Sequence, residues 1–227
     1  TPFSLLTNSS PTGMCLTTSF VLIMYKTLVN YIRAALFTLV LLGASSTVLA
    51  NTVLILGDSL SAAYGIDPKL GWVELLKPQL PKINIINGSI SGETTSGGLK
   101  RLPTLLEKHK PNLVVVELGA NDGLRGQPLS LLKSNLTSIV DLSQAINSKV
   151  LLLEMHVPIN YGRRYSERFN QTFHQIAADK GITVAPFLLE NVATKPELIQ
   201  ADGLHPTAQA QSIMLQNVLP HIKHLLN

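Results

Sequence analysis

Short apolar runs of strand length alternate with helical segments along most of this chain, and this alternation limits the possible folds more than any other feature. The clearest run, at 113–118, is continuous, rich in β-branched residues and bounded by Pro111 and Gly119. Strand–helix alternation predicts parallel pairing, and strands that are apolar throughout indicate that both faces of the sheet are covered. The expected strands are 53–56, 83–86, 113–118, 150–153 and 182–184, and the expected helices are 71–80, 99–109, 128–147, 166–179 and 207–226. The sequence therefore predicts an α/β fold, a three-layer α/β/α sandwich with a central, mostly parallel sheet.

The N-terminal part of the sequence has the pattern of a targeting segment. Residues 24–50 carry two cations, Lys26 and Arg33, then an apolar run, then small residues that end at Ala50. These are the three parts of a secretory signal peptide. A membrane anchor is the alternative, but the uninterrupted apolar stretch at 34–42 is about half of what a membrane span requires. We therefore expect a signal peptide at 24–50, no stable membrane span after its cleavage, and one domain at 51–227.

Charge and cysteine content exclude further classes of function. Of the 18 Lys and Arg residues, two precede Ala50, which leaves 16 against 14 Asp and Glu in residues 51–227. This balance is no electrostatic footprint for nucleic acid. The single cysteine, Cys15, lies in residues 1–23, which follow no helical or strand period and which we interpret as leader or over-read sequence. We expect neither a disulfide nor a thiol nucleophile in the folded domain.

Three polar clusters follow predicted strands and a fourth precedes the last helix. In parallel α/β sheets, ligands bind beyond the carboxyl ends of the strands. Taken alone, each cluster has an ordinary explanation: Ser59 is a favoured helix N-cap, Asn121 begins an Asn-Asp-Gly sequence typical of turns, and His205 precedes a helix. The clusters lie at 57–59, 88–93, 119–122 and 202–205.

Together, the four clusters supply the groups that acyl transfer requires. A serine hydroxyl becomes a nucleophile when an imidazole accepts its proton, and a carboxylate fixes the tautomer of that imidazole. Asp202 and His205, three residues apart, are the candidates for this pair, with Ser59 as the nucleophile. The developing oxyanion needs preorganised donors. The candidates are the backbone N–H groups of Ser59 and Gly92 and the side-chain amide of Asn121.

The same blocks resemble a known family. GDSL at 57–60, Gly92 within SISGETTSGG, GAND at 119–122 and DGLH at 202–205 are similar, in order, to the four blocks of the GDSL (SGNH) hydrolases. The stretches LILGDSLSAAYGI, RLPTLLEKHKP, VVVELGANDGLRG and PINYGRRY resemble its bacterial periplasmic arylesterase, acyl-CoA thioesterase and lysophospholipase branch, over essentially all of residues 51–227. The third block of that branch commonly reads Gly-Gly-Asn-Asp, whereas this chain has Ala120 at the second position.

The resemblance implies a flavodoxin-like fold and assigns the site. It implies a catalytic triad of Ser59, Asp202 and His205, and an oxyanion hole formed by Ser59, Gly92 and Asn121. It implies no cofactor and no metal.

Other classes of enzyme and of binding protein remain as alternatives. The G-x-S-x-G nucleophile elbow is absent, because the second residue after Ser59 is a serine, and no phosphate-loop or dinucleotide pattern occurs. A metal-dependent phosphoesterase could use Asp58, Asn121, Asp202 and His205 as ligands, and loss of activity with a chelator would indicate it. The fold could also serve a non-catalytic binder of small ligands.

We therefore predict a periplasmic or secreted serine hydrolase that acts as a monomer on small acyl esters and acyl thioesters through an acyl-enzyme on Ser59. The expected activities are those of an arylesterase, an acyl-CoA thioesterase and a lysophospholipase. Leu124, Pro158, Ile159 and Tyr161 could line an acyl groove.

Several neighbouring residues have less specific roles. We expect Asp58 to hydrogen-bond backbone near the serine, Glu93 and Asp122 to brace their loops, and His156 to pack rather than react. The loop at 160–165 either rims the substrate groove or is a solvated turn.

Overall fold

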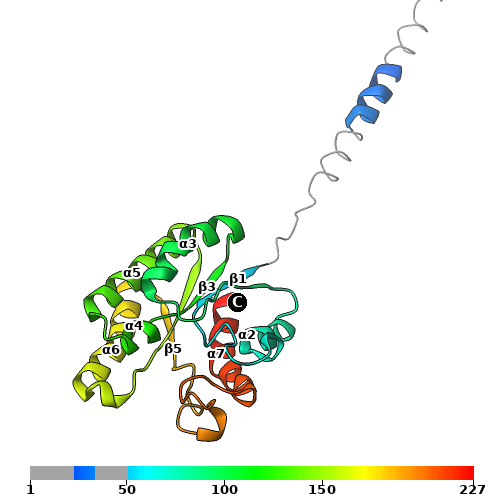
Figure 1. The fold of residues 1–227 in the computed structure, drawn as a ribbon. Coiled ribbons are helices and arrows are strands. Elements are labelled where there is room, and N and C mark those ends of the chain that lie inside the picture. Colours follow the sequence, from blue (N-terminus) through cyan, green and yellow to red (C-terminus); the bar gives the residue numbers. More distant parts are fainter. Residues whose placement is uncertain (1–22, 34–50) are drawn as a thin grey trace, which may run out of the picture. The chain divides into compact units, whose positions relative to one another are not determined.

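The computed structural model describes residues 23–33 and 51–227 of the chain (Figure 1). Residues 23–33 form a helix with largely exposed side chains. Most of the predicted signal peptide, residues 34–50, and nearly all of the segment at 1–23 lie outside the described residues, so these predictions stay open. Among the residues that are described, no helix is both long and apolar enough to cross a membrane.

Residues 51–227 are built around a five-stranded parallel sheet in the order β2-β1-β3-β4-β5. All six residues of β1 and all five of β3 are buried, as expected for strands covered on both faces. The edge strand β2 is only partly buried. The strands are β1 (Thr52–Gly57), β2 (Asn84–Asn87), β3 (Leu113–Glu117), β4 (Lys149–Leu153) and β5 (Thr183–Ala185).

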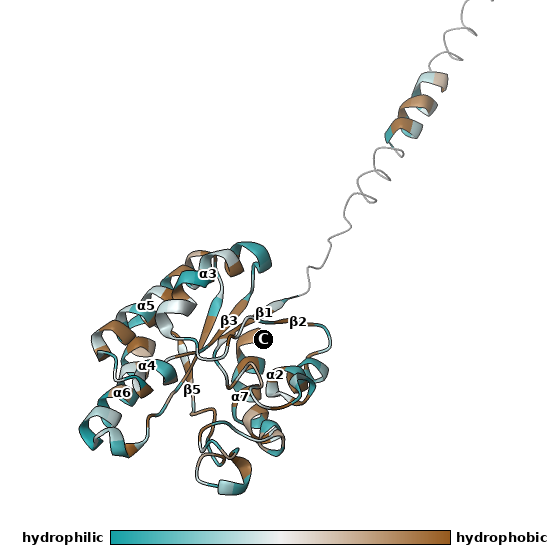
Figure 2. Ribbon diagram, in the orientation of Figure 1, coloured by the Kyte–Doolittle hydropathy of each residue, from teal (hydrophilic) through white to brown (hydrophobic). Residues whose placement is uncertain are grey.

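Helices cover both faces of the sheet and complete three layers (Figure 1). One layer consists of α3 (Thr95–His109), α5 (Leu129–Ala145) and α6 (Arg163–Lys180), and the other of α2 (Trp72–Leu76) and α7 (Gln211–Leu226). Hydrophobic residues run along the strands and hydrophilic residues colour the outer helix surfaces in Figure 2. The predicted sandwich is confirmed.

Short helical turns connect these elements. They are η1 (Pro68–Leu70), η2 (Lys77–Gln79), α4 (Ala120–Leu124), η3 (Ile159–Tyr161), η4 (Pro196–Leu198) and η5 (Ala208–Ala210).

Several predicted helix starts were wrong: α6 begins three residues before the expected 166, and α7 begins four residues after the expected 207 because the turn η5 precedes it. The error in α3 lies next to the site. Helix α3 begins four residues before the expected start because Thr94 caps it: the Thr94 side chain accepts a hydrogen bond from the N–H of Gly97 (3.3 Å). Its two glycines lower the helix propensity of the first turn. One of them is required by packing, since a Cβ at Gly98 would lie 2.4 Å from Leu118.

The Asn-Asp-Gly sequence at 121–123, which taken alone is typical of a turn, lies inside the short helix α4 in the structure. The chain enters this helix through Gly119, whose φ of 120° is open to glycine and unfavourable for other residues.

The strand order creates a crevice at one place in the sheet. The connection from β1 leads to β2 on one side, and the connection from β2 returns to β3 on the other side of β1. Neighbouring strands whose connections diverge in this way leave an open crevice beyond their carboxyl ends, as in other folds of flavodoxin-like order. Here the crevice lies beyond β1 and β3, next to Asp58 and Asn121.

Candidate active site

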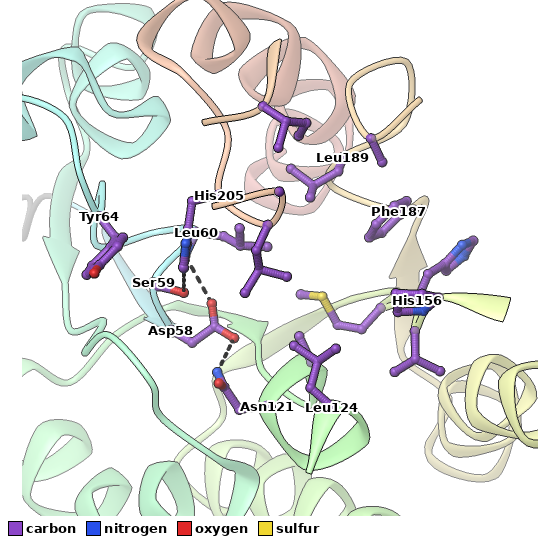
Figure 3. A pocket seen from close by; sticks show the side chains of 18 of the residues that line it. Asp58, Ser59, Leu60, Tyr64, Asn121, Leu124, His156, Phe187, Leu189 and His205 are labelled. Atoms are coloured by element: carbon purple, nitrogen blue, oxygen red, sulfur yellow. Dashed lines mark hydrogen bonds between the residues drawn. The ribbon is translucent and has the colours of Figure 1, made fainter. Parts of the chain in front are cut away.

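Ser59, His205 and Asp202 form one hydrogen-bonded chain at this crevice (Figure 3 shows the first two). The Ser59 Oγ atom lies 2.9 Å from His205 Nε2, and His205 Nδ1 lies 2.6 Å from Asp202 Oδ2. The serine comes from the loop after β1, whereas the acid and the imidazole come from the loop before η5. Residues 146 positions apart in the sequence thus meet in the geometry that lets an imidazole accept the proton of a serine hydroxyl.

The acid and the imidazole are held by their own loop. Asp202 Oδ1 accepts hydrogen bonds from the backbone N–H of Leu204 (2.9 Å) and of His205 (3.0 Å). Together with the bond from the His205 ring, these donors lower the pKa of Asp202 to about 2. Asp202 is therefore ionised at neutral pH.

A second set of contacts places the His205 loop over Ser59. The carbonyl of His205 accepts a hydrogen bond from the N–H of Gln200 (2.7 Å). The side-chain amide of Gln200 donates to the carbonyls of Tyr64 (2.8 Å) and Pro206 (2.9 Å). The Tyr64 ring lies against the imidazole, with 4.4 Å between ring centroids. These contacts tie the loop to the segment that follows Ser59.

The three predicted oxyanion donors border the same cavity. Among the described residues, the backbone N–H groups of Ser59 and Gly92 donate to no protein acceptor, so both are free to bind an oxyanion. Gly92 has a φ of 76°, a conformation that side chains disfavour. The Asn121 amide is already occupied: Nδ2 donates to Asp58 Oδ2 (3.0 Å) and to the Glu93 carbonyl (3.0 Å). Because both partners are acceptors, the side-chain nitrogen of Asn121, and not its oxygen, faces Asp58 and Glu93.

Asp58 is buried beneath the serine, as expected, and supports the backbone there. Its Oδ1 accepts from the N–H of Leu60 (3.0 Å). Burial raises the pKa of Asp58 to about 6, although hydrogen bonds from Leu60 and Asn121 and the nearby His205 act in the opposite direction.

Glu117 is the residue that the sequence analysis missed. It ends β3, is completely buried, and accepts hydrogen bonds from the Asp58 N–H and the Ser61 hydroxyl. Burial and the neighbouring Asp58 raise its pKa well above the ordinary value. The available signal was an acid inside an otherwise apolar strand, which the hydrophobic pattern of 113–118 had hidden.

The cavity beside Ser59 is mostly apolar. It measures about 770 Å³, and its lining includes Ser59, His205, Leu60, Phe187 and His156 (Figure 3). Of the four residues expected to line an acyl groove, Leu124 and Pro158 do so. Ile159 and Tyr161 lie outside the lining and are exposed. None of the residues at 160–165 lines the cavity, which favours the solvated-turn interpretation of that loop.

The comparison with protein families identifies the chain. Residues 55–213 match the model of the GDSL-like Lipase/Acylhydrolase family. The chain belongs to this family.

Named relatives agree with the family match. This protein is 47% identical to an esterase, TesA, from Pseudomonas aeruginosa. The match covers 78% of this chain and 90% of the relative. The protein is 41% identical to a thioesterase 1/protease 1/lysophospholipase L1 from Escherichia coli, over 78% of its length and 86% of the relative's. The crystal structure of the esterase EstA from Pseudoalteromonas, inhibited by monoethylphosphonate, superposes with a TM-score of 0.75 at 46% identity, covering 78% of this chain and 99% of that one. The GDSL chain is thus an enzyme that hydrolyses esters.

Two predicted loop braces are present around the GDSL site. Asp122 is buried and accepts hydrogen bonds from the N–H (2.9 Å) and hydroxyl (2.5 Å) of Thr95 at the start of α3. Glu93 pairs with Arg101 (2.7 Å). His156 packs as predicted, stacked on Phe187 with centroids 4.3 Å apart, and it borders the cavity, as its place after the fourth strand suggested.

The phosphoesterase alternative finds no support in the donor groups. Within 23–33 and 51–227, no cluster of three or more His, Cys, Asp or Glu residues is placed to hold a metal ion.

Proposed function

We propose that this GDSL enzyme cleaves acyl esters and acyl thioesters through an acyl-enzyme on Ser59. His205 accepts the proton of the Ser59 hydroxyl while the Oγ atom attacks the acyl carbonyl, and Asp202 stabilises the imidazolium that results. His205 then donates this proton to the leaving group. In the second half of the reaction, His205 accepts a proton from water, the resulting hydroxide attacks the acyl carbon, and the fatty acid leaves as Ser59 regains its proton.

In this mechanism the oxyanion of each tetrahedral intermediate is bound by three donors. They are the N–H groups of Ser59 and Gly92 and the side-chain amide of Asn121. The observation that carries the proposal is the short chain Ser59–His205–Asp202 at the mouth of an apolar cavity.

The cavity supports an acyl chain as the group that is recognised. Its apolar walls, among them Leu60, Leu124 and Leu189, would surround a hydrocarbon chain whose carbonyl lies at Ser59. Asn121 and His205 are polar lining residues near Ser59, where the alcohol or thiol would leave. We propose that acyl-CoA thioesters, lysophospholipids and aryl esters are all substrates, since the contacts concern the acyl half that they share.

We also propose that residues 24–50 are a cleaved signal peptide, that the enzyme is periplasmic or secreted, and that it acts as a monomer. All proposed site residues come from one chain within 51–227. N-terminal sequencing of the exported protein tests the cleavage after Ala50, and light scattering of the purified protein tests the monomer.

The experiment that tests the mechanism is hydrolysis of p-nitrophenyl butyrate by the purified protein, without added metal, beside Ser59→Ala. We expect activity that is unaffected by a chelator and is lost in Ser59→Ala. An active Ser59→Ala variant would show that Ser59 is only a loop residue. Loss of wild-type activity with the chelator would instead support the alternative of a metal-dependent enzyme.

A further inference from the structure

Glu117 has no counter-charge for its carboxyl group. The side chain has no solvent exposure, and in the described residues no lysine or arginine forms an ion pair with it. Burying such a group is unfavourable unless hydrogen bonds or a retained proton compensate. A completely buried acid at the end of the strand beside the nucleophile therefore needs an explanation that core packing does not supply.

The contacts of Glu117 hold the chain on both sides of Ser59. One oxygen, Oε2, accepts from the backbone N–H of Asp58 (3.1 Å) and from the hydroxyl of Ser61 (2.7 Å). These residues come immediately before Ser59 and two positions after it. The position of Gly57 allows this approach, because a Cβ there would lie 2.7 Å from Glu117 Oε2. Asp58 and Ser61, which lie on either side of Ser59 in the sequence, are thus linked through an acid from the neighbouring strand.

The same contacts lead on to the proposed oxyanion hole. Asp58, whose N–H is held by Glu117, uses Oδ2 to accept a hydrogen bond from Asn121 Nδ2 (3.0 Å). A displacement of Asp58 would therefore move the Ser59 backbone N–H and the Asn121 amide together.

We propose that Glu117 is a positioning residue for this reaction: it touches no substrate atom, but its carboxyl group fixes the turn that carries Ser59 and, through Asp58, the amide of Asn121. The inference rests on the proposed function of Ser59 and Asn121. A displacement of about 1 Å at a reacting group costs on the order of 100-fold in rate, so the loss of such an anchor is measurable.

The charge of Glu117 follows from its neighbours. The titratable group that faces it is Asp58, and Asp58 in turn faces Glu117 and His205. Burial and the Asp58 charge raise the pKa of Glu117 well above its ordinary value, which favours the protonated, neutral form of its carboxyl group. Glu117 therefore acts as a neutral hydrogen-bonding group. Glutamine, which keeps a neutral carbonyl acceptor, should replace it far better than leucine, which has a similar volume and no acceptor.

The test compares Glu117→Gln and Glu117→Leu with wild type and Ser59→Ala in the full chain. The kcat and KM for p-nitrophenyl butyrate are measured from pH 5 to 10, with folding checked by circular dichroism. We expect Glu117→Leu to lose about 100-fold in kcat with KM changed by less than about threefold. We expect Glu117→Gln to keep kcat within about tenfold and to leave the acid limb of its pH profile in place.

A matched pair of serine variants keeps the test decisive if Glu117→Leu fails to fold. Ser61→Ala removes a buried hydroxyl that contacts Glu117, whereas Ser143→Ala removes a buried hydroxyl that donates to Ile139 within α5 (2.8 Å), away from the site. The proposal requires a several-fold loss of kcat in Ser61→Ala and none in Ser143→Ala.

The possible failures are distinguishable. A folded Glu117→Leu variant with wild-type kcat, or equal turnover of the two serine variants, would overturn the positioning role. An acid limb that moves to lower pH in Glu117→Gln would show that Glu117 is ionised in the wild type and would overturn its neutral role. Activity that persists in Ser59→Ala would instead overturn the proposed function itself.

Discussion

Replacement of Asn121 by alanine removes one of the proposed oxyanion donors and leaves the proposed triad in place. The substitution deletes an amide that donates to Asp58 Oδ2 and to the Glu93 carbonyl, both at 3.0 Å. It alters none of the contacts among Ser59, His205 and Asp202. The effect on rate therefore reports the contribution of this donor to the transition state.

The contacts of Asn121 set the size of the expected effect. Loss of one oxyanion-hole donor lowers kcat by about 100- to 1,000-fold, or about 2.7–4 kcal/mol. In this enzyme both amide hydrogens have acceptors in the free state, so binding the oxyanion requires sharing or exchanging the bond to Asp58. Part of the gain is offset by that exchange. We therefore expect a loss near the lower end, about 100-fold in kcat, with KM changed by less than about threefold.

Steady-state hydrolysis of p-nitrophenyl butyrate at pH 8 measures both constants. Asn121→Asp is the matched variant: it keeps the size of the side chain but replaces the donor with a carboxylate beside Asp58, and it should lose more activity than Asn121→Ala. If KM rises in Asn121→Ala while kcat is unchanged, the amide binds the ground state and does not belong to the oxyanion hole.

Three further substitutions test the remaining parts of the site. Asp202→Asn keeps an oxygen for the two backbone donors but presents an N–H to His205 Nδ1, which selects the wrong tautomer; we expect kcat to fall by about 100- to 10,000-fold, and a loss below tenfold would contradict the assigned role. Gly92→Ala forces a side chain into a φ of 76° and should reduce both kcat and thermal stability, whereas Gly126→Ala, at a φ of 64° with open space around it, should reduce stability alone. Asp58→Asn should alter the pH dependence of stability: the pKa of Asp58 is raised to about 6 in the folded state, so its contribution to the free energy of unfolding decreases by about 2 kcal/mol as pH rises from 4 to 7. Urea unfolding at pH 4, 5 and 7 should show the variant gaining relative to wild type across this range, and a constant difference would refute the raised pKa.

The sequence predicted much of this enzyme because its strongest patterns are local. Strand β3 stands out as a buried apolar run, and the family blocks contain every residue of the proposed triad and oxyanion hole. What the sequence could not provide are contacts between segments. The hydrogen bonds from Thr95, at the start of α3, to Asp122 join positions 27 residues apart. Glu117 was missed for the same reason: its partners at Asp58 and Ser61 are more than 50 residues away.

One part of the site is held by contacts within a single loop, and two parts depend on contacts between segments that are distant in the sequence. Asp202 and His205 need only their own loop, whose backbone N–H groups also lower the pKa of the acid. Bringing His205 to Ser59 depends on Gln200, which links that loop to the segment after the serine. Aligning Ser59 with Asn121 depends on β1 and β3 being neighbours, and Glu117 lies at the end of β3, where a single carboxyl group can contact the turn after β1. The connections that run to opposite sides of β1 open the crevice. The buried carboxyl group of Glu117 holds the segment that carries Ser59 beside this crevice.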